Sequence, residues 1–231
     1  MFKLLLIEDD QSLFQEMKQQ LNQWNYAVYG IDDWSKVMET YASTAPDLVL
    51  IDVQLPMFDG FHWCRMIRAH SSVPILFLSS RDHPTDHVMA MQLGADDFIQ
   101  KPFHLDVLIA KIQATLRRTY NYNQADSGNI IRTWQGATVD VEQNLVTYNE
   151  QSVELTKNEM FILKQLLERK NKIVSRDDLI KELWDDKRFI SDNTLTVNVN
   201  RLRKQLMKLD LGQYIETKVG QGYIAVEGEH G

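Results

Sequence analysis

Polar side chains capable of chemistry follow four short apolar runs in the first half of the chain. Because the carboxyl ends of parallel strands meet at one edge of a sheet, we expect these side chains to lie close together. Clustered carboxylates repel one another, so a cation among them would stabilise the group. Oxygen ligands suit Mg²⁺, which also keeps several of its waters. The residues are Glu8, Asp9 and Asp10 after residues 4–7, Asp52 after 48–51, Ser79 after 75–78 and Lys101 after 98–99.

This pattern predicts an acceptor site for a phosphoryl group. A bound cation can orient a phosphoryl donor and neutralise charge while the group moves to a carboxylate. Asp52 would be that carboxylate, and the Lys101 ammonium and the Ser79 hydroxyl would hold phosphoryl oxygens. A lone Asp after a strand is more often a turn or cap residue. The prediction therefore depends on these residues occurring together, in order, at successive strand ends.

The elements that would position these residues alternate between strand-like and helix-like patterns up to about residue 118. Five aliphatic or β-branched runs, at 4–7, 27–31, 48–51, 75–78 and 98–99, are separated by stretches whose apolar residues recur every three or four positions. This alternation predicts an α/β fold, a doubly wound five-stranded parallel sheet covered by helices on both faces. No Gly-x-Gly-x-x-Gly follows the first run, which disfavours a dinucleotide-binding domain.

The length of 231 residues suits two domains of ordinary size. A polar stretch at 120–129 predicts a linker between a domain over residues 1–119 and a second over 130–231. The single cysteine, Cys64, excludes an internal disulfide, and no apolar run approaches the ~20 residues of a membrane span, so we expect a cytoplasmic protein. The net charge of −7 argues against indiscriminate nucleic-acid binding, so a DNA-binding role requires a local basic face.

The second half has a different pattern and predicts an α+β domain. Four short alternating runs, at 130–134, 137–141, 145–148 and 152–155, predict a small antiparallel sheet. Helical patterns follow at 157–170, 176–183 and 193–209, and then two short strands on either side of residues 220–222. Thr156 and Glu159 have the spacing of a capping box at the start of the first helix.

The helix expected at 193–209 combines an apolar stripe with a basic face. Between positions 193 and 208 there are four basic residues and no acidic one. Arg and Asn side chains can read guanine and adenine in the major groove, and a second helix that follows a shorter one across a loop is typical of DNA readers. A solvated charged face is the simpler alternative. The residues expected to contact DNA are Asn193, Thr194, Val197, Asn198, Arg201, Lys204 and Lys208, with Thr194 and Asn198 at the flank of the exposed face.

Two segments of the first half, LIDVQLPMFDG at 50–60 and GADDFIQKPF at 94–103, closely resemble the receiver domain of bacterial two-component response regulators. The resemblance implies a cis peptide bond before Pro102, and it places Phe98 where the family has a switch aromatic, often Tyr. It assigns the site residues as follows: Asp52 as phosphoacceptor, Glu8, Asp9, Asp52 and the backbone carbonyl of Gln54 as Mg²⁺ ligands, and Ser79 and Lys101 as phosphoryl-binding groups.

The second half, with LTKNEM at 155–160 and TKVGQGY at 217–223, resembles the winged-helix output domain of OmpR/PhoB-type regulators. The resemblance implies that 193–209 is the recognition helix, that 176–183 is the positioning helix and that the hairpin around 220–222 is a wing. Many relatives carry Arg where Val219 stands, so Lys218 would contact phosphate instead. Shorter motifs, FHWCR at 61–65 and FLSSRD at 77–82, resemble the bacitracin-responsive Bce-type subgroup, which answers cell-wall-active peptide antibiotics.

These resemblances imply a phosphorylation-controlled, DNA-binding transcriptional regulator that is not an enzyme. Its expected partners are promoter DNA, a membrane sensor histidine kinase, a second copy of the chain after phosphorylation, and RNA polymerase. The residues with charge suited to the dimer face are Asp96, Asp97, Lys111 and Arg118. Two alternatives remain open: a Mg²⁺-dependent phosphatase with an aspartyl nucleophile, and a DNA-binding protein that acts independently of phosphorylation.

Overall fold

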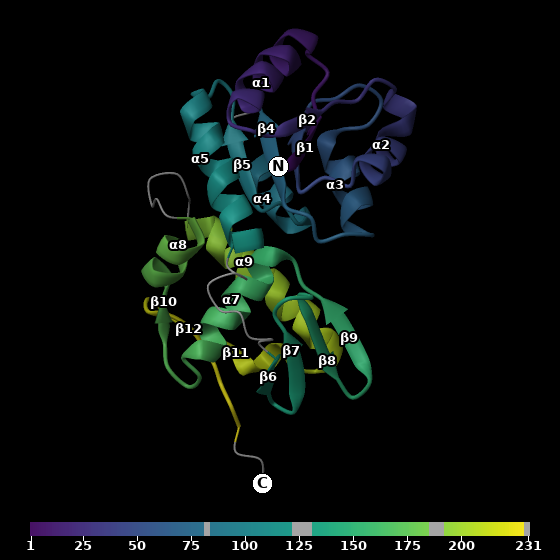
Figure 1. Ribbon diagram of the computed structural model, residues 1–231. Coiled ribbons are helices and arrows are strands. Elements are labelled where there is room, and N and C mark those ends of the chain that lie inside the picture. The colour runs from purple at the N-terminus through teal and green to yellow at the C-terminus, as the bar shows by residue number, and fades with distance from the viewer. Residues whose placement is uncertain (81–83, 122–130, 185–191, 229–231) are drawn as a thin grey trace. The chain divides into compact units, whose positions relative to one another are not determined.

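The structure, a computed structural model, describes residues 1–80, 84–121, 131–184 and 192–228 (Figure 1). Contacts within the chain divide it into two compact units, Met1–Arg117 and Arg118–Gly231. Most of the linker predicted at 120–129 falls on residues 122–130, outside the described ranges. Within those ranges, no helix has both the length and the apolar character needed to cross a membrane.

The first unit is built on a five-stranded parallel sheet with the strand order β2-β1-β3-β4-β5. β3 and β4 are buried along their whole length because helices cover both faces of the sheet. The register pairs Ile7 with Ile51 and Ser79 with Gln100, so the carboxyl ends of neighbouring strands lie together. The predicted fold is thereby confirmed. The strands are β1 (Lys3–Ile7), β2 (Ala27–Tyr29), β3 (Leu48–Asp52), β4 (Ile75–Ser79) and β5 (Asp97–Gln100).

Helices connect successive strands of this sheet. In Figure 1, α1 and α5 lie together on one side of the strands, and α2 and α3 lie on the other. The Asp10 side chain caps α1 and the Asp59 side chain caps α3. The helices are α1 (Gln11–Gln23), the 3₁₀ turn η1 (Trp34–Lys36), α2 (Val37–Thr44), α3 (Gly60–Arg68), α4 (Pro84–Leu93) and α5 (Leu105–Leu116).

The described residues of the second unit form two antiparallel sheets and three main helices. The four-stranded sheet runs β6-β7-β8-β9, with β6 (Ile131–Trp134), β7 (Ala137–Asp140), β8 (Leu145–Tyr148) and β9 (Gln151–Glu154). The helices are α7 (Lys157–Glu168), α8 (Arg176–Trp184) and α9 (Asp192–Leu206). The three-stranded sheet runs β10-β12-β11, with β10 (Val174–Ser175), β11 (Ile215–Lys218) and β12 (Gly222–Ala225). The winged-helix prediction is confirmed.

Two details of the second unit differ from the sequence-based expectation. The helix expected to reach residue 209 is α-helical only to Leu206, and the 3₁₀ turn η4 (Met207–Leu209) continues it; a second 3₁₀ turn, η5 (Gly212–Tyr214), precedes β11. Strand β10 was not predicted. Two residues are too few to show a period of two, and β10 exists because it pairs with Gly222 and Tyr223 of β12.

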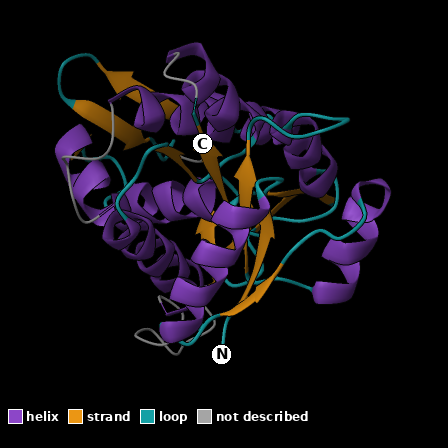
Figure 2. Ribbon diagram, turned by 90° about the horizontal axis from the view of Figure 1, so that it is seen from above, coloured by secondary structure: helices purple, strands orange, loops and turns teal. Residues whose placement is uncertain are grey.

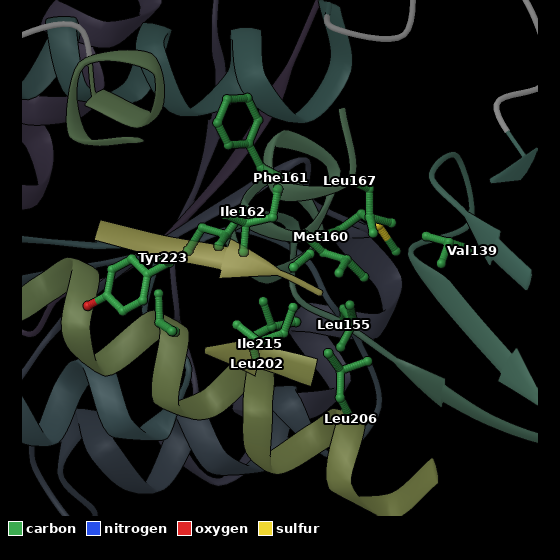
Figure 3. Packing of buried hydrophobic residues seen from close by; sticks show 14 of the residues in the cluster. Val139, Leu155, Met160, Phe161, Ile162, Leu167, Leu202, Leu206, Ile215 and Tyr223 are labelled. Carbon is green, nitrogen blue, oxygen red and sulfur yellow. The ribbon is translucent and has the colours of Figure 1, made fainter. Parts of the chain in front are cut away.

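A single apolar core joins the helices and sheets of the second unit. Figure 3 shows side chains from α7, α9 and the wing strands β11 and β12 gathered in this cluster. α7 is its central helix, since every residue from Asn158 to Leu167 is buried. The predicted stripe of α9 and η4 faces the same core: Leu195, Val199, Leu202, Leu206 and Leu209 are all buried.

The predicted capping box begins α7. The Oγ1 of Thr156 accepts a hydrogen bond from the backbone N–H of Glu159 at 3.4 Å, and Glu159 Oε2 accepts one from the backbone N–H of Thr156 at 2.8 Å. Both bonds satisfy helix-end donors that the buried environment would otherwise leave unpaired. The capping box therefore fixes where the central helix starts.

Thr156→Ala should destabilise the second unit. It removes the side-chain acceptor at the N-cap, so we expect the free energy of unfolding to fall by about 1 kcal/mol. Urea denaturation of the full chain, followed by far-UV circular dichroism, would measure this. Thr138→Ala, at an exposed position of β7, is the matched control and should change stability much less. Equal losses in the two variants would contradict the role of the cap.

Candidate functional site

Three carboxylates lie together at the carboxyl ends of β1 and β3. Glu8, Asp9 and Asp52 each offer an oxygen, and these oxygens are all within 4.8 Å of one another. Glu8 and Asp52 are buried, whereas Asp9 is exposed. Asp10 instead caps α1, because its Oδ1 accepts hydrogen bonds from the backbone N–H groups of Ser12 at 2.9 Å and Leu13 at 3.1 Å. The predicted cluster forms from Glu8, Asp9 and Asp52.

Lys101 reaches into this cluster from the end of β5. Its Nζ lies 2.5 Å from Asp52 Oδ2 and 2.7 Å from Glu8 Oε2, so one ammonium is shared by two carboxylates. The predicted cis peptide bond joins Lys101 to Pro102, and the Lys101 backbone N–H donates to the carbonyl of Ser79 at 2.6 Å. Lys101 is thus held beside Asp52 by both its backbone and its side chain.

The pKa shifts follow from this burial. Burial raises the pKa of the Glu8 carboxyl, and the hydrogen bond from Lys101 opposes the rise. Burial alone would lower the pKa of Lys101, but its hydrogen bonds to Asp52 and Glu8 outweigh that effect, and the pKa is raised. Glu8 and Asp52 share the Lys101 ammonium, and Asp9 adds a third carboxylate, so among the described residues the cluster retains negative charge. An all-oxygen donor set with one exposed member fits Mg²⁺, which takes hard oxygen ligands and keeps waters.

The loop after β3 holds the Asp52 carboxylate in place. The Gln54 backbone N–H donates to Asp52 Oδ1 at 2.9 Å, so the residue whose carbonyl is the expected further ligand is bonded to the Asp52 carboxylate. A Cβ on Gly60 would lie 2.1 Å from the backbone oxygen of Asp52, so only glycine allows α3 to begin against β3. Ser79 is fully buried at the end of the adjacent strand β4.

Phe98 of β5 packs beside His87 of α4. Their ring centroids are 5.3 Å apart with an interplanar angle of 82°. On the same strand, Asp97 Oδ2 pairs with the Nζ of Lys111 from α5 at 2.7 Å, and both side chains are mostly buried. Burial lowers the pKa of His87, an effect that the charge of Asp97 opposes. These residues connect α4, β5 and α5.

Asp96 does not have the surface position expected of a dimer residue. It is buried, and its Oδ2 accepts hydrogen bonds at 2.9 Å from both Arg68 NH2 and the Ile75 backbone N–H. The sequence analysis did not identify Arg68, which also donates from Nε to the Gly94 carbonyl at 2.9 Å. No local pattern indicated this pairing, because Arg68 ends α3 and Asp96 lies 28 positions later, just before β5. Arg118 lies in the short π-helix η2 (Arg117–Asn121), where the two units meet along the chain.

The residues of α9 expected to contact DNA differ in how exposed they are. Thr194 and Asn198 are buried, and Asn198 Nδ2 donates to the Thr194 carbonyl at 2.9 Å, so their predicted place at the flank of an exposed face is wrong. Val197 is half-buried, and Lys204 is exposed. The side chain of Asn193 lies outside the described part of the chain.

The remaining basic residues also have partners within the unit. Arg201 NH2 lies 3.0 Å from Oε1 of the buried Glu159, which ties α9 to the start of α7. Lys208 is exposed in η4, where its Nζ donates to Gln205 Oε1 at 2.7 Å. Lys218 Nζ pairs with Glu216 Oε2 at 2.6 Å on β11, and Val219, at the turn of the wing, is 89% exposed.

Comparisons with known proteins agree with both units. A family model for the response regulator receiver domain matches residues 4–113, and one for the C-terminal domain of transcriptional regulatory proteins matches residues 150–225. The sensory transduction protein BceR of Bacillus subtilis (strain 168) is 71% identical over 227 residues, covering 98% of this chain and 97% of that protein. The response regulator protein GraR of Staphylococcus epidermidis is 54% identical over 225 residues, covering 97% of this chain and 100% of that protein.

A solved structure supports the fold over the whole length. A mutant of RitR matches with a TM-score of 0.79 and 25% identity, covering 99% of this chain and 100% of that one. The two family matches occur in the same order as the parallel α/β unit and the winged-helix unit. The chain therefore belongs to the response regulators of two-component systems, in the OmpR/PhoB group that joins a receiver domain to a DNA-binding winged helix.

Proposed function

We propose that phosphoryl transfer from a histidine kinase to Asp52 controls promoter binding by the winged-helix unit. The carrying observation is the Asp52 carboxylate, which shares the Lys101 ammonium with Glu8 and lies within 4.8 Å of Asp9. In the transfer, an Asp52 oxygen forms a bond to phosphorus. The bond from phosphorus to the kinase imidazole nitrogen breaks, and its electron pair stays on that nitrogen.

The chain's own residues have defined parts in this transfer. Glu8, Asp9, Asp52 and the Gln54 carbonyl would hold Mg²⁺, which when bound neutralises charge on the phosphoryl oxygens. Lys101, already hydrogen-bonded to Asp52, would remain within reach of a phosphoryl oxygen on the same carboxylate. The Ser79 hydroxyl, at the end of the neighbouring strand, would donate a hydrogen bond to another phosphoryl oxygen.

The readout of phosphorylation would use the surface formed by α4, β5 and α5. New charge and acceptor oxygens at Asp52 would shift the equilibrium between two arrangements of this surface. Phe98, which packs on His87, has no hydroxyl group and so would take part through packing and not through a hydrogen bond. The dimer would be symmetric, with Asp97, Lys111 and Arg118 as its charged residues. Asp97 and Lys111 already pair within one copy, so the dimer would require them to share or exchange partners.

DNA recognition would use α9 and the wing. Within the described residues, Val197, Arg201, Lys204 and Lys208 remain candidates, together with Asn193 and with Lys218 of the wing. A dimer would place two such helices on half-sites about one duplex turn apart, from which the protein would act on RNA polymerase. The identity to BceR and the short Bce-type motifs support a response to cell-wall-active antibiotics.

Asp52→Asn should abolish phosphorylation. We expect the wild-type chain, incubated with Mg²⁺ and acetyl phosphate, to gain one base-labile phosphoryl group by intact mass spectrometry, and the variant to gain none. Asp59→Asn is the matched control, since an Asn side chain can still cap α3. Promoter binding measured in parallel should rise only where the adduct forms. Equal binding by both proteins with and without phosphodonor would favour the phosphorylation-independent alternative.

Asp9→Asn should weaken Mg²⁺ binding by about tenfold or more, because it removes the charge of an exposed cluster member. Isothermal titration of the unphosphorylated chain with MgCl₂ would measure the change. Asp10→Asn should bind Mg²⁺ like the wild type, since Asp10 caps α1 and Asn is an equally good cap. A similar loss in both variants would argue that general surface charge, not the defined cluster, attracts the cation.

His87 should make the receiver less stable in mild acid. Its pKa is lowered in the folded state, so the unfolded chain binds the proton more tightly. Stability is therefore fully present above the unfolded pKa of about 6.5 and is lost as the pH falls through the folded pKa. His87→Gln should flatten the dependence of the unfolding midpoint on pH below about 6.5, whereas the exposed His104→Gln should leave it unchanged. A wild-type slope in His87→Gln would contradict this assignment.

A further inference from the structure

Tyr223 is a buried aromatic residue at the centre of the DNA-binding unit. It lies on β12, the middle strand of the three-stranded sheet, where it pairs with Thr217 of β11 and Val174 of β10. Its side chain is 2% exposed. In Figure 3 the ring borders the apolar cluster and the hydroxyl points away from the other labelled side chains. The ring therefore has an apolar side and a polar end that needs a partner.

Arg203 connects α9 to the wing across this ring. Its Nε donates to the Ile215 carbonyl at 2.7 Å and its NH2 donates to Thr217 Oγ1 at 2.7 Å, both on β11. The guanidinium carbon lies 5.8 Å from the centroid of the Tyr223 ring. Two fixed donors and a cation–π contact hold the planar group in one orientation. Arg203 is thus bonded to the backbone and side chain of the wing strand.

Arg176 approaches the same ring from the start of α8. Its NH1 donates to the Tyr223 hydroxyl at 2.6 Å, and its NH2 donates to Thr196 Oγ1 of α9 at 2.9 Å. The guanidinium carbon lies 5.5 Å from the ring centroid. A single side chain therefore connects the positioning helix, the recognition helix and the wing.

We infer that Arg176, Tyr223 and Arg203 form a positioning clamp that fixes the wing against the recognition helix, and that the two arginines serve DNA binding through this clamp. The inference rests on the proposed DNA-reading role of α9 and the wing. Helix and wing engage a duplex more tightly if their separation is fixed before binding, because ordering them on DNA would cost affinity. The clamp supplies that order in the free protein.

The alternative is that both arginines are ordinary phosphate contacts of a basic surface. The two roles differ in what lysine can replace. A phosphate contact depends mainly on a positive charge, which Lys retains. The clamp instead requires the planar guanidinium group of Arg203, which donates to Ile215 and to Thr217 at the same time. Arg203→Lys therefore separates the two roles while leaving the net charge unchanged. Tyr223→Phe provides a second, milder variant, since it removes only the hydroxyl that Arg176 binds.

The first test measures the wing without DNA. Amide hydrogen exchange of the full chain, read by mass spectrometry, should be faster at 215–225 in both variants than in the wild type, while peptides of the receiver unit exchange as before. Lys204→Gln, at an exposed neighbouring position of α9, is the control and should leave the wing amides unchanged. Unchanged exchange at 215–225 in both folded variants would overturn the clamp.

The second test measures binding to a duplex that the phosphodonor-treated wild-type chain selects from a randomised library. Arg203→Lys should bind this duplex about tenfold more weakly, the loss expected for hydrogen bonds to a charged group, with an unchanged salt slope. Lys204→Gln should reduce that slope by about one. Wild-type affinity in Arg203→Lys would overturn the clamp. A wild-type chain that selects no duplex would overturn the DNA-reading function instead, and the exchange test would still decide the clamp.

Discussion

The ammonium of Lys101, shared between the buried carboxylates of Glu8 and Asp52, is the interaction on which the first unit depends. Burying a carboxylate without a cation costs free energy. Removing one partner of a buried ion pair therefore destabilises a protein more than replacing the whole pair with apolar residues. The parallel sheet makes the sharing geometrically simple, because β1, β3 and β5 end at the same edge. With Asp9 added, the carboxylates outnumber the cations among the described residues of the site, and this excess of negative charge suits it to a divalent cation.

The second unit uses its positive charge in a different way. Arg201 compensates the buried Glu159 that also closes the capping box of α7, and Arg203 is bonded to β11. Part of the basic character of α9 therefore holds the unit together, whereas Lys204 of α9 and Lys208 of η4 are exposed. A chain of net charge −7 can therefore still present a locally basic surface, which is the property that the proposed DNA-binding role requires.

Regular elements were predictable because their signals are local. Strands buried on both faces read as continuous apolar runs, as β3 and β4 do, and Thr156 with Glu159 marked the start of α7 through spacing alone. β10 was missed because it consists of two residues whose partner strand lies almost fifty positions later along the chain. Its existence depends on a tertiary contact and has no period of its own.

The sequence by itself determined the two-unit order, the strand ends and the identity of the residues around Asp52, because these follow from periodicity and from side-chain types at successive strand ends. Only the tertiary structure decided which charged groups are partners. Asp96 is buried against Arg68, and Arg203 is bonded to the wing strand β11. Thr194 and Asn198 are likewise buried, and a hydrogen bond joins them. The physical reason is that a side chain's partner is set by elements that meet in space, and such meetings leave no trace in local spacing.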